Sequence, residues 1–220
     1  ELYDTLHTLE AMHLDAIVVR HKVSGTPDEL VRHAMSGVSV INAGDGNRAH
    51  PTQGLLDLLT IRQHRPDFEN LSVAICGDVK HSRVARSDVH ALTAMGVADI
   101  RLCGPASLMP EAAEFPQCHL YDDFDQAIEG VDAVIMLRLQ KERMAQTELP
   151  DETAYFRQFG LDTRRLAMAR KGCLVMHPGP INRGIEIAPE VADGAQSRIL
   201  EQVGNGVFTR MAVLSELLAR

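Results

Sequence analysis

The segment GDGNRAHPTQ, residues 44–53, follows a strand-like apolar run at residues 38–43 and opens a helix. Its two glycines permit the backbone turns needed where a strand ends, and Pro51 suits the first position of a helix. His50 and Gln53 then stand at the amino end of that helix, where negative charge is favoured. Their side chains can form hydrogen bonds with a carbonyl oxygen and with an amide. The segment predicts a strand–helix junction suited to a small anionic carbonyl compound, although a His-Pro pair before a helix is more often only a capping arrangement.

Short runs rich in valine and isoleucine alternate with helix-length segments along the rest of the chain. This alternation is typical of a parallel sheet covered by helices on both faces. Strands are predicted at 16–19, 38–41, 71–76, 100–103, 133–137 and 174–176, and helices at 2–12, 27–36, 52–64, 82–95, 123–129, 162–170 and 197–219. The predicted fold class is α/β, with ligands binding in the cleft at the carboxyl ends of the strands.

Two domains are expected, each a doubly wound parallel sheet, joined by two interdomain helices. A polar turn with a proline at residues 64–67 marks the boundary. The first domain comprises residues 1–51 together with 197–220, whose closing helix is expected to pack back on the first half. Residues 52–65 form a linking helix, and residues 66–196 form the second domain.

Composition excludes several classes of function. The 220 residues include 22 Lys and Arg against 30 Asp and Glu, a formal net charge of −8, so no basic field exists to attract nucleic acid or an acidic membrane. No apolar run approaches the roughly 20 residues that a membrane span needs. The four cysteines show no metal-ligand spacing and are expected as reduced thiols. A soluble, cytoplasmic protein without a metal site is predicted.

Cationic residues follow two of the predicted strands. Arg20 comes directly after residues 16–19, at a strand's carboxyl end. Lys80 and Arg83 lie in the segment at residues 76–83, which opens another helix. Taken alone, each segment favours an ordinary alternative. For Arg20 this is a solvated surface arginine after a strand, and for the second segment a capped turn with Ser82 or Asp78 as cap and with Lys80 and Arg83 exposed.

Two further segments close the strands at 133–137 and 174–176. Arg138 and Gln140 are separated by one residue, so strand alternation aims them the same way, and a guanidinium beside an amide suits a carboxylate ligand. The run at residues 138–143 is otherwise a solvated charged turn, as most such runs are. In the turn at residues 176–180, His177 is either a structural hydrogen bonder or part of a ligand-binding loop.

Six segments, in order along the whole chain, resemble the aspartate carbamoyltransferase (aspartate transcarbamoylase) catalytic-chain family. They are VVRH at 18–21, NAGDGxxxHPTQ at 42–53, GDxxHSRVARS at 77–87, RxQxER at 138–143, MHPGPxNRGxEI at 176–187 and GNGVFTRMAVL at 204–214. The resemblance implies transfer of a carbamoyl group from carbamoyl phosphate to the α-amino group of L-aspartate, with release of phosphate, in de novo pyrimidine biosynthesis. It implies no metal, organic cofactor or covalent nucleophile.

The resemblance also assigns residues and partners. Those implied to bind carbamoyl phosphate are Arg20, His50, Gln53, Pro178 and Gly179, with Arg20 and His50 catalytic and the Gly179–Pro180 bond cis. Those implied to bind aspartate are Arg83, Arg138, Gln140 and, more weakly, Lys80. The first domain becomes the carbamoyl-phosphate domain and residues 66–196 the aspartate-binding domain. A homotrimer is implied, and a larger complex with regulatory or dihydroorotase-like chains stays open.

One departure from the family pattern concerns the beginning of the chain. The family's STRTR phosphate-binding loop, and the mobile loop that gives a serine and a lysine to the neighbouring subunit, have no counterpart here. The expectation is that the sequence is a fragment whose first domain is incomplete and whose activity alone is open. A non-catalytic homologue that acts as a scaffold subunit is therefore one alternative.

Ornithine carbamoyltransferase is the nearest catalytic alternative, since it shares the fold and an HPxQ element. That family usually carries an HCLP turn where this chain has MHPGP at residues 176–180, and it lacks the HSRVARS pattern. Arg138 and Gln140 are also better suited to binding the carboxylate of aspartate than to binding the cationic side chain of ornithine. Aspartate is thus the expected acceptor.

Overall fold

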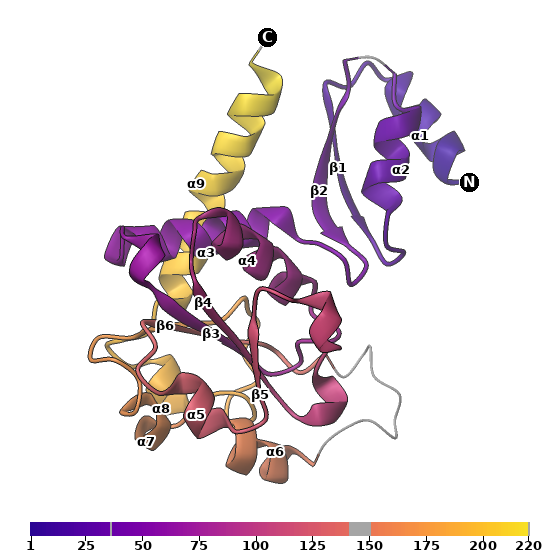
Figure 1. Cartoon of the computed structure of the whole chain (residues 1–220). Helices are drawn as coiled ribbons and strands as arrows, with labels where there is room; N and C mark the ends of the chain where they lie inside the picture. The colour runs from indigo at the N-terminus through magenta and orange to yellow at the C-terminus, as the bar shows by residue number, and fades with distance from the viewer. Residues whose placement is uncertain (36, 141–150, 220) are drawn as a thin grey trace.

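The computed structural model describes residues 1–35, 37–140 and 151–219. The chain begins with a small unit in which β1 (Ala16–His21) and β2 (Ser39–Asp45) form a parallel two-stranded sheet. Helices α1 (Leu2–Glu10) and α2 (Thr26–His33) lie beside this sheet, at the indigo end of the chain in Figure 1. The strand–helix alternation predicted from the sequence is confirmed here.

A larger parallel sheet of five strands forms the centre of the rest of the chain, in the order β5-β4-β3-β6-β7. The strands are β3 (Ser72–Cys76), β4 (Asp99–Cys103), β5 (His119–Tyr121), β6 (Ala133–Met136) and β7 (Leu174–Met176). The helices are α3 (Pro51–His64), α4 (Arg83–Ala94), α5 (Phe124–Ile128), α6 (Glu152–Phe159), α7 (Thr163–Leu166), α8 (Pro189–Ala192) and α9 (Ile199–Leu218). The strand order reverses between β3 and β6, which is where open α/β sheets bind ligands.

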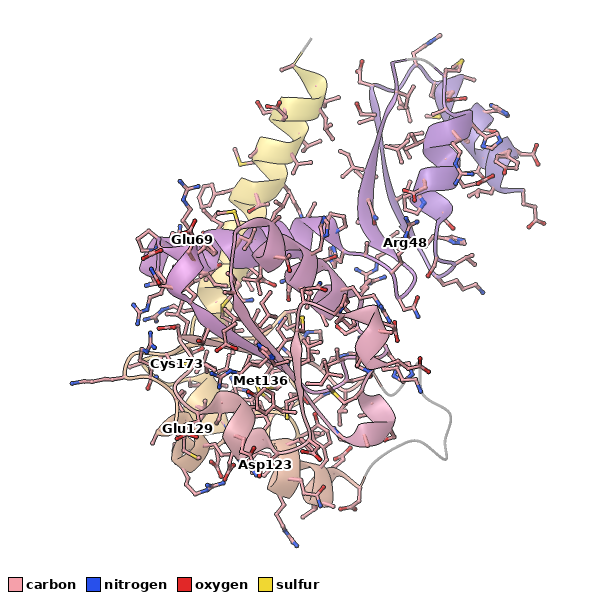
Figure 2. All side chains as sticks on the ribbon, viewed as in Figure 1. Arg48, Glu69, Asp123, Glu129, Met136 and Cys173 are labelled. Carbon is pink, nitrogen blue, oxygen red and sulfur yellow. The ribbon has the colours of Figure 1, made fainter. Side chains whose placement is uncertain are left out.

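The five-stranded sheet is buried on both faces. Val73 and Ile75 of β3 join one hydrophobic cluster, whereas Ala74 and Cys76 join the cluster on the opposite face. This split follows from the alternation of side chains along a strand. Figure 2 shows the side chains around Met136 of β6, which is fully buried. The predicted α/β class with a doubly covered parallel sheet is confirmed.

The polar contacts between α3 and α9 hold the closing helix to the first half of the chain. Asn205 donates to Thr60 Oγ1 at 2.9 Å, and His64 Nε2 lies 2.8 Å from Glu201 Oε1. Figure 1 shows α9, in yellow, crossing α3 and rising beyond the sheet. The closing helix thus packs on α3, the helix predicted to link the two domains.

Several elements differ from the sequence prediction. The short strand β5, at the sheet edge, was not predicted because its three residues are not buried and form no apolar run. Helices α6 and α8 were also missed, and the helix predicted over 162–170 ends at Leu166. In each case the segment is too short to show a clear period of hydrophobic residues.

The expectations about cysteines and membrane spans can be compared with the described residues. All four cysteines are free, and Cys76, Cys103 and Cys173 are buried. Within residues 1–35, 37–140 and 151–219, no helix has both the length and the apolar character that crossing a bilayer requires.

Candidate active site

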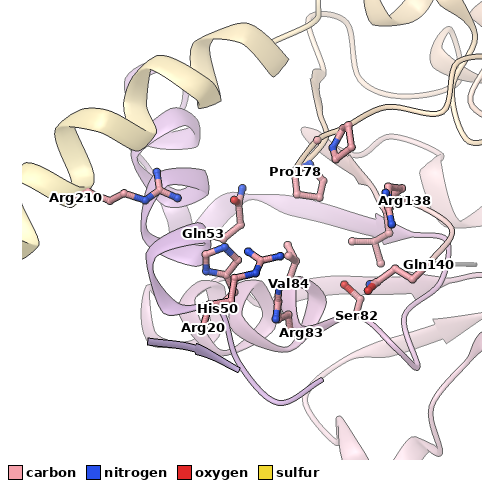
Figure 3. Close-up of a pocket in the computed structure, with 13 residues that line it drawn as sticks. Arg20, His50, Gln53, Ser82, Arg83, Val84, Arg138, Gln140, Pro178 and Arg210 are labelled. Atoms are coloured by element: carbon pink, nitrogen blue, oxygen red, sulfur yellow. The ribbon is translucent and has the colours of Figure 1, made fainter. Parts of the chain in front are cut away.

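A cavity of about 450 Å³ lies at the carboxyl ends of the strands, beside the point where the sheet order reverses. Figure 3 shows it between α3, the start of α4, the segments that follow β6 and β7, and α9. Its lining residues are Arg20, His50, Gln53, Ser82, Arg83, Val84, Leu137, Arg138, Gln140, Pro178, Gly179, Pro180 and Arg210. Eight of the nine predicted site residues are in this set, although they are far apart in the sequence.

His50 is the residue just before α3, which begins at Pro51 as the sequence predicts. Its backbone N–H donates to Ser87 Oγ at 2.8 Å, which ties the turn to α4. Burial, and then the charges of Arg83, Arg20 and Arg210, lower the pKa of His50 to about 4. The ring is therefore neutral at pH 7, with one nitrogen able to donate and the other able to accept a hydrogen bond.

Gln53 lies in the first turn of α3 and is almost fully buried. Its amide nitrogen Nε2 lies 3.1 Å and 3.2 Å from the two carboxylate oxygens of Asp57, one turn later in the helix. Because Nε2 is used in this way, the carbonyl oxygen Oε1 is the group that remains for a ligand. That oxygen can accept a hydrogen bond from an amide NH₂ group.

Arg83 is the first residue of α4 and is only 7% exposed. Ser82 caps the helix by accepting a hydrogen bond from the Ala85 N–H at 3.1 Å, so the predicted capped turn is confirmed, but the exposed Arg83 that went with it is wrong. The same turn nevertheless brings Arg83 into the cavity, where its Nη1 lies 3.4 Å from the Gly46 carbonyl oxygen. Capping and ligand binding are therefore compatible in this turn.

Arg138 and Gln140 follow β6, are partly exposed and both line the cavity, whereas Leu137 and Leu139 are each only 1% exposed, Leu137 at the cavity wall. The predicted alternation, which aims Arg138 and Gln140 the same way, is confirmed. Gln140 Nε2 is 3.4 Å from the His81 carbonyl oxygen, so it bridges toward the start of α4. The remainder of the predicted charged turn, residues 141–143, lies outside the described residues.

The loop after β7 is held by the buried His177. Its Nδ1 accepts a hydrogen bond from the Gly179 N–H at 2.9 Å, and its Nε2 lies 3.1 Å from Glu186 Oε1. Since Nδ1 acts as an acceptor, the ring carries its proton on Nε2 and donates to Glu186. His177 is thus a structural hydrogen bonder, and it fixes the Pro178–Gly179 segment at the cavity wall. The Gly179–Pro180 bond is cis, as the resemblance implies.

Arg20 and Lys80 differ in their placement. Arg20 stands near the end of β1, opposite Gly44 and just after an irregularity in the pairing of β1 with β2, and it lines the cavity. Lys80 is exposed and does not line the cavity. Its backbone N–H donates to the Leu108 carbonyl oxygen at 2.9 Å. The role at the aspartate side that the resemblance gives to Lys80 stays a prediction.

Arg210 of α9 is the main lining residue that the sequence prediction missed. Figure 3 shows it reaching from α9 toward Gln53 and His50. It lies in the GNGVFTR motif at residues 204–210, which the resemblance covers but to which no role was assigned. Only its place in this motif could have indicated Arg210 as a site residue. Taken alone, an arginine on a long helix is usually on a solvated face.

The cavity is strongly cationic although the chain as a whole is acidic. Four arginines line it, from β1, α4, the segment after β6 and α9. The start of α4 adds the positive end of a helix dipole, which also favours anions. This arrangement suits two small anionic reactants held side by side, with His50 and Gln53 available for a carbonyl oxygen and an amide.

Family models match nearly the whole chain. The carbamoyl-P binding domain of aspartate/ornithine carbamoyltransferase matches residues 1–63, and the Asp/Orn binding domain matches residues 69–217. The chain belongs to the aspartate/ornithine carbamoyltransferase family. The boundary between the two matches falls at the end of α3.

Curated relatives in this carbamoyltransferase family include aspartate carbamoyltransferase catalytic subunits. The chain is 56% identical over 216 residues to that of Stenotrophomonas maltophilia (strain R551-3), covering 98% of the chain and 68% of the relative. It is equally 56% identical to that of Xanthomonas campestris pv. campestris (strain B100), covering 98% of the chain and 69% of the relative. The chain thus spans about two thirds of these relatives' length.

Solved carbamoyltransferases share the fold. Aspartate transcarbamoylase from Trypanosoma cruzi, in complex with carbamoyl aspartate and phosphate, superposes with a TM-score of 0.83 at 29% identity, over 97% of this chain and 69% of that one. Ornithine carbamoyltransferase from Thermus thermophilus gives 0.85 at 27% identity, over 99% and 71%. The fold therefore does not separate the two acceptors, whereas the 56% identical relatives are aspartate enzymes.

Proposed function

We propose that the chain catalyses transfer of the carbamoyl group of carbamoyl phosphate to L-aspartate, giving N-carbamoyl-L-aspartate and phosphate, in pyrimidine biosynthesis. The observation that carries this proposal is that one cavity brings two sets of residues together. His50 and Gln53 lie near arginines on one side, and Arg138 and Gln140 lie at another wall. The 56% identity to aspartate carbamoyltransferase catalytic subunits supports it. The Trypanosoma cruzi relative was solved with carbamoyl phosphate and aspartate together.

In this proposal the carbamoyl group is held by residues of α3 and its neighbours. His50, neutral because of its low pKa, donates a hydrogen bond to the carbonyl oxygen, and Arg20 adds positive charge beside it. Gln53 accepts from the carbamoyl NH₂ through its Oε1. The backbone carbonyls of Pro178 and Gly179 accept from the amino groups of the two substrates.

Aspartate lies on the other side of the cavity. Arg83, Arg138 and Gln140 bind its carboxylates, since guanidinium groups form paired hydrogen bonds with a carboxylate. The more peripheral role of Lys80 remains part of the proposal, although its side chain is exposed. This arrangement brings the α-amino nitrogen up to the carbamoyl carbon.

Chemically, the nitrogen lone pair forms a C–N bond, and the C–O bond to phosphate breaks as the tetrahedral intermediate collapses. The ammonium proton passes to the departing phosphate, which lies beside it. Orienting two reactants can supply on the order of 7 to 11 kcal/mol of the barrier. Loss of one donor to the oxyanion costs roughly 3 kcal/mol, which sets the scale for His50 and Arg20.

We further propose which parts of the chain bind each substrate and how the chain assembles. Residues 1–51 with 197–220 bind carbamoyl phosphate, residues 52–65 link the two domains, and residues 66–196 bind aspartate. A cytoplasmic homotrimer, alone or with regulatory or dihydroorotase-like chains, is the proposed form. Exposed apolar side chains on α9 support association, since Leu200, Val203 and Phe208 are 85%, 67% and 64% exposed.

The experiment is a turnover assay with carbamoyl phosphate and either L-aspartate or L-ornithine. It is run on the purified chain and on a version extended at its amino terminus to the length of the relatives. Product from aspartate and none from ornithine supports the proposal. Product from ornithine alone would identify the other branch of the family, and folded protein without turnover in either version would favour a scaffold subunit.

A further inference from the structure

A buried carboxylate stands directly behind Gln53. Asp57 is only 2% exposed, and both of its oxygens lie within hydrogen-bonding distance of Gln53 Nε2, at 3.1 Å and 3.2 Å. A carboxylate can only accept hydrogen bonds, so it holds the NH₂ end of the Gln53 amide. The carbonyl end is then turned away from Asp57 and toward the cavity, which Gln53 lines.

Asp57 is also joined to the opposite wall of the cavity. Gln202 of α9 donates from Nε2 to Asp57 Oδ1 at 2.6 Å, and its carbonyl oxygen accepts from the His177 N–H at 2.9 Å. His177 in turn fixes Gly179 through its ring. A continuous chain of hydrogen bonds therefore runs from Gln53 through Asp57 and Gln202 to the loop that carries Pro178 and Gly179.

A second buried carboxyl group, Asp88 of α4, lies against Asp57 and determines where the charge resides. Leu58, Ile61, Leu92 and Ile135 surround the pair. Burial and the neighbouring Asp57 raise the pKa of Asp88 well above its usual value, so Asp88 keeps its proton beside Asp57. Burial raises the pKa of Asp57 only to about 6, since Gln202 and Gln53 donate hydrogen bonds to its carboxylate. Asp57 is therefore the mainly ionised member at neutral pH.

We propose that Asp57 is a positioning residue that holds the Gln53 amide with its carbonyl oxygen toward the cavity. The site then selects an acyl phosphate whose carbonyl carbon bears an NH₂ group over one whose carbonyl carbon bears a methyl group. This inference rests on the proposed function, because it concerns the carbamoyl group of the same substrate. The selectivity is assigned to the orientation of one amide. Asp57 itself does not touch the substrate.

The probe for this selectivity is acetyl phosphate, which has a methyl group where carbamoyl phosphate has its NH₂. In Asp57→Asn, the new amide keeps its oxygen toward Gln202 and presents NH₂ to Gln53, so the Gln53 amide turns over and aims its own NH₂ into the cavity. A donor then faces the carbamoyl NH₂ donor. We expect the affinity for carbamoyl phosphate to fall roughly 10- to 100-fold, with acetyl phosphate inhibition nearly unchanged.

The double variant Gln53→Glu with Asp57→Asn exchanges the carboxylate and the amide. One oxygen of the introduced carboxylate accepts from the new amide, and the other faces the cavity as an acceptor. We expect the preference for carbamoyl phosphate over acetyl phosphate to be restored. Gln53→Glu alone sets two carboxylates against each other and is expected to bind carbamoyl phosphate poorly.

Asn205→Ala is the matched structural control, because Asn205 joins α9 to Thr60 of α3 in the same interface without touching Gln53. It is expected to lower the melting temperature while the preference between the two phosphates stays as in the wild type. This separates a loss of stability from a loss of orientation.

The outcomes distinguish this inference from the proposed function. A wild-type protein with no carbamoyl transfer contradicts the proposed function itself. A wild-type protein that turns over, with Asp57→Asn retaining the full preference for carbamoyl phosphate, overturns the inference alone. If Asp57→Asn does not fold, the double variant decides, since a folded double variant without the preference also overturns it.

Discussion

The guanidinium group of Arg83 occupies the space that a side chain on Gly44 would fill. A Cβ atom on Gly44 would lie 2.7 Å from Arg83 Cζ and 2.8 Å from Nη1. Gly44 also has a φ of +140°, a conformation that other residues rarely adopt. The glycine at the end of β2 is therefore what allows an arginine of α4 to enter the cavity between the two sheets.

Gly44→Ala is expected to displace Arg83 and raise the KM for aspartate roughly tenfold or more, since a hydrogen bond to a charged group contributes about 1.5–3 kcal/mol. Steady-state kinetics with varied aspartate measure this. Gly25→Ala is the matched control, because Gly25 has a φ of +90° and the nearest atom to its Cβ is Arg48 Nη1 at 3.9 Å. A KM that stays unchanged in Gly44→Ala would contradict the placement of Arg83 at the aspartate site.

His50 is expected to remain neutral down to a pH of about 4 in the folded protein. An unfolded histidine titrates near 6.5, so between these values the unfolded chain binds a proton that the folded chain does not. The stabilisation is complete above pH 6.5 and is lost as the pH falls toward 4, by up to about 3 kcal/mol. NMR titration of the His50 ring measures the folded pKa, and a midpoint near 6.5 would refute the burial argument.

Asp88→Asn is expected to raise the free energy of unfolding, and more so at pH 8 than at pH 5. The folded Asp88 keeps its proton because burial and Asp57 raise its pKa, whereas the unfolded carboxyl loses it above about pH 4. The cost of the wild-type carboxyl therefore grows with pH, and the asparagine, which carries no titrating group, avoids it. Denaturant titrations at both pH values measure the difference, with Asp122→Asn at an exposed site as control. Equal effects at both pH values would show that the pair does not share a proton.

Arg210→Gln is expected to weaken the binding of anionic substrates roughly tenfold, because one of the four cavity arginines is lost. The effect should shrink at high salt, where charges are screened. Arg183→Gln serves as control, because Arg183 pairs with Asp193 at 2.7 Å and does not line the cavity. Equal losses in the two variants would mean that overall charge, rather than the cavity, governs binding.

The sequence predicts much of this architecture for identifiable physical reasons. Buried parallel strands such as β3 and β6 are continuous apolar runs, so their positions could be read directly. The carboxyl ends of such strands meet at one edge, which is why residues as distant as His50 and Arg138 could be expected in one site.

Other features depend on tertiary contacts and could not be read in this way. The pairing of Asp57 with Asp88 joins two helices whose carboxylates look like ordinary solvated positions in the sequence. The same holds for Arg210, which enters the cavity only because α9 packs across α3. Lys80 is the opposite case, a residue that the sequence places at the site. Its neighbours Ser82 and Arg83 line the cavity, whereas Lys80 itself is exposed.

The central claim is that the cavity at the carboxyl ends of the strands is where carbamoyl transfer takes place. The most direct test is the rate of carbamoylaspartate formation by His50→Ala beside the wild type, with circular dichroism confirming that both are folded. Loss of one donor to the developing oxyanion should lower kcat by roughly 10²- to 10³-fold. A folded His50→Ala variant with the wild-type rate would contradict the account.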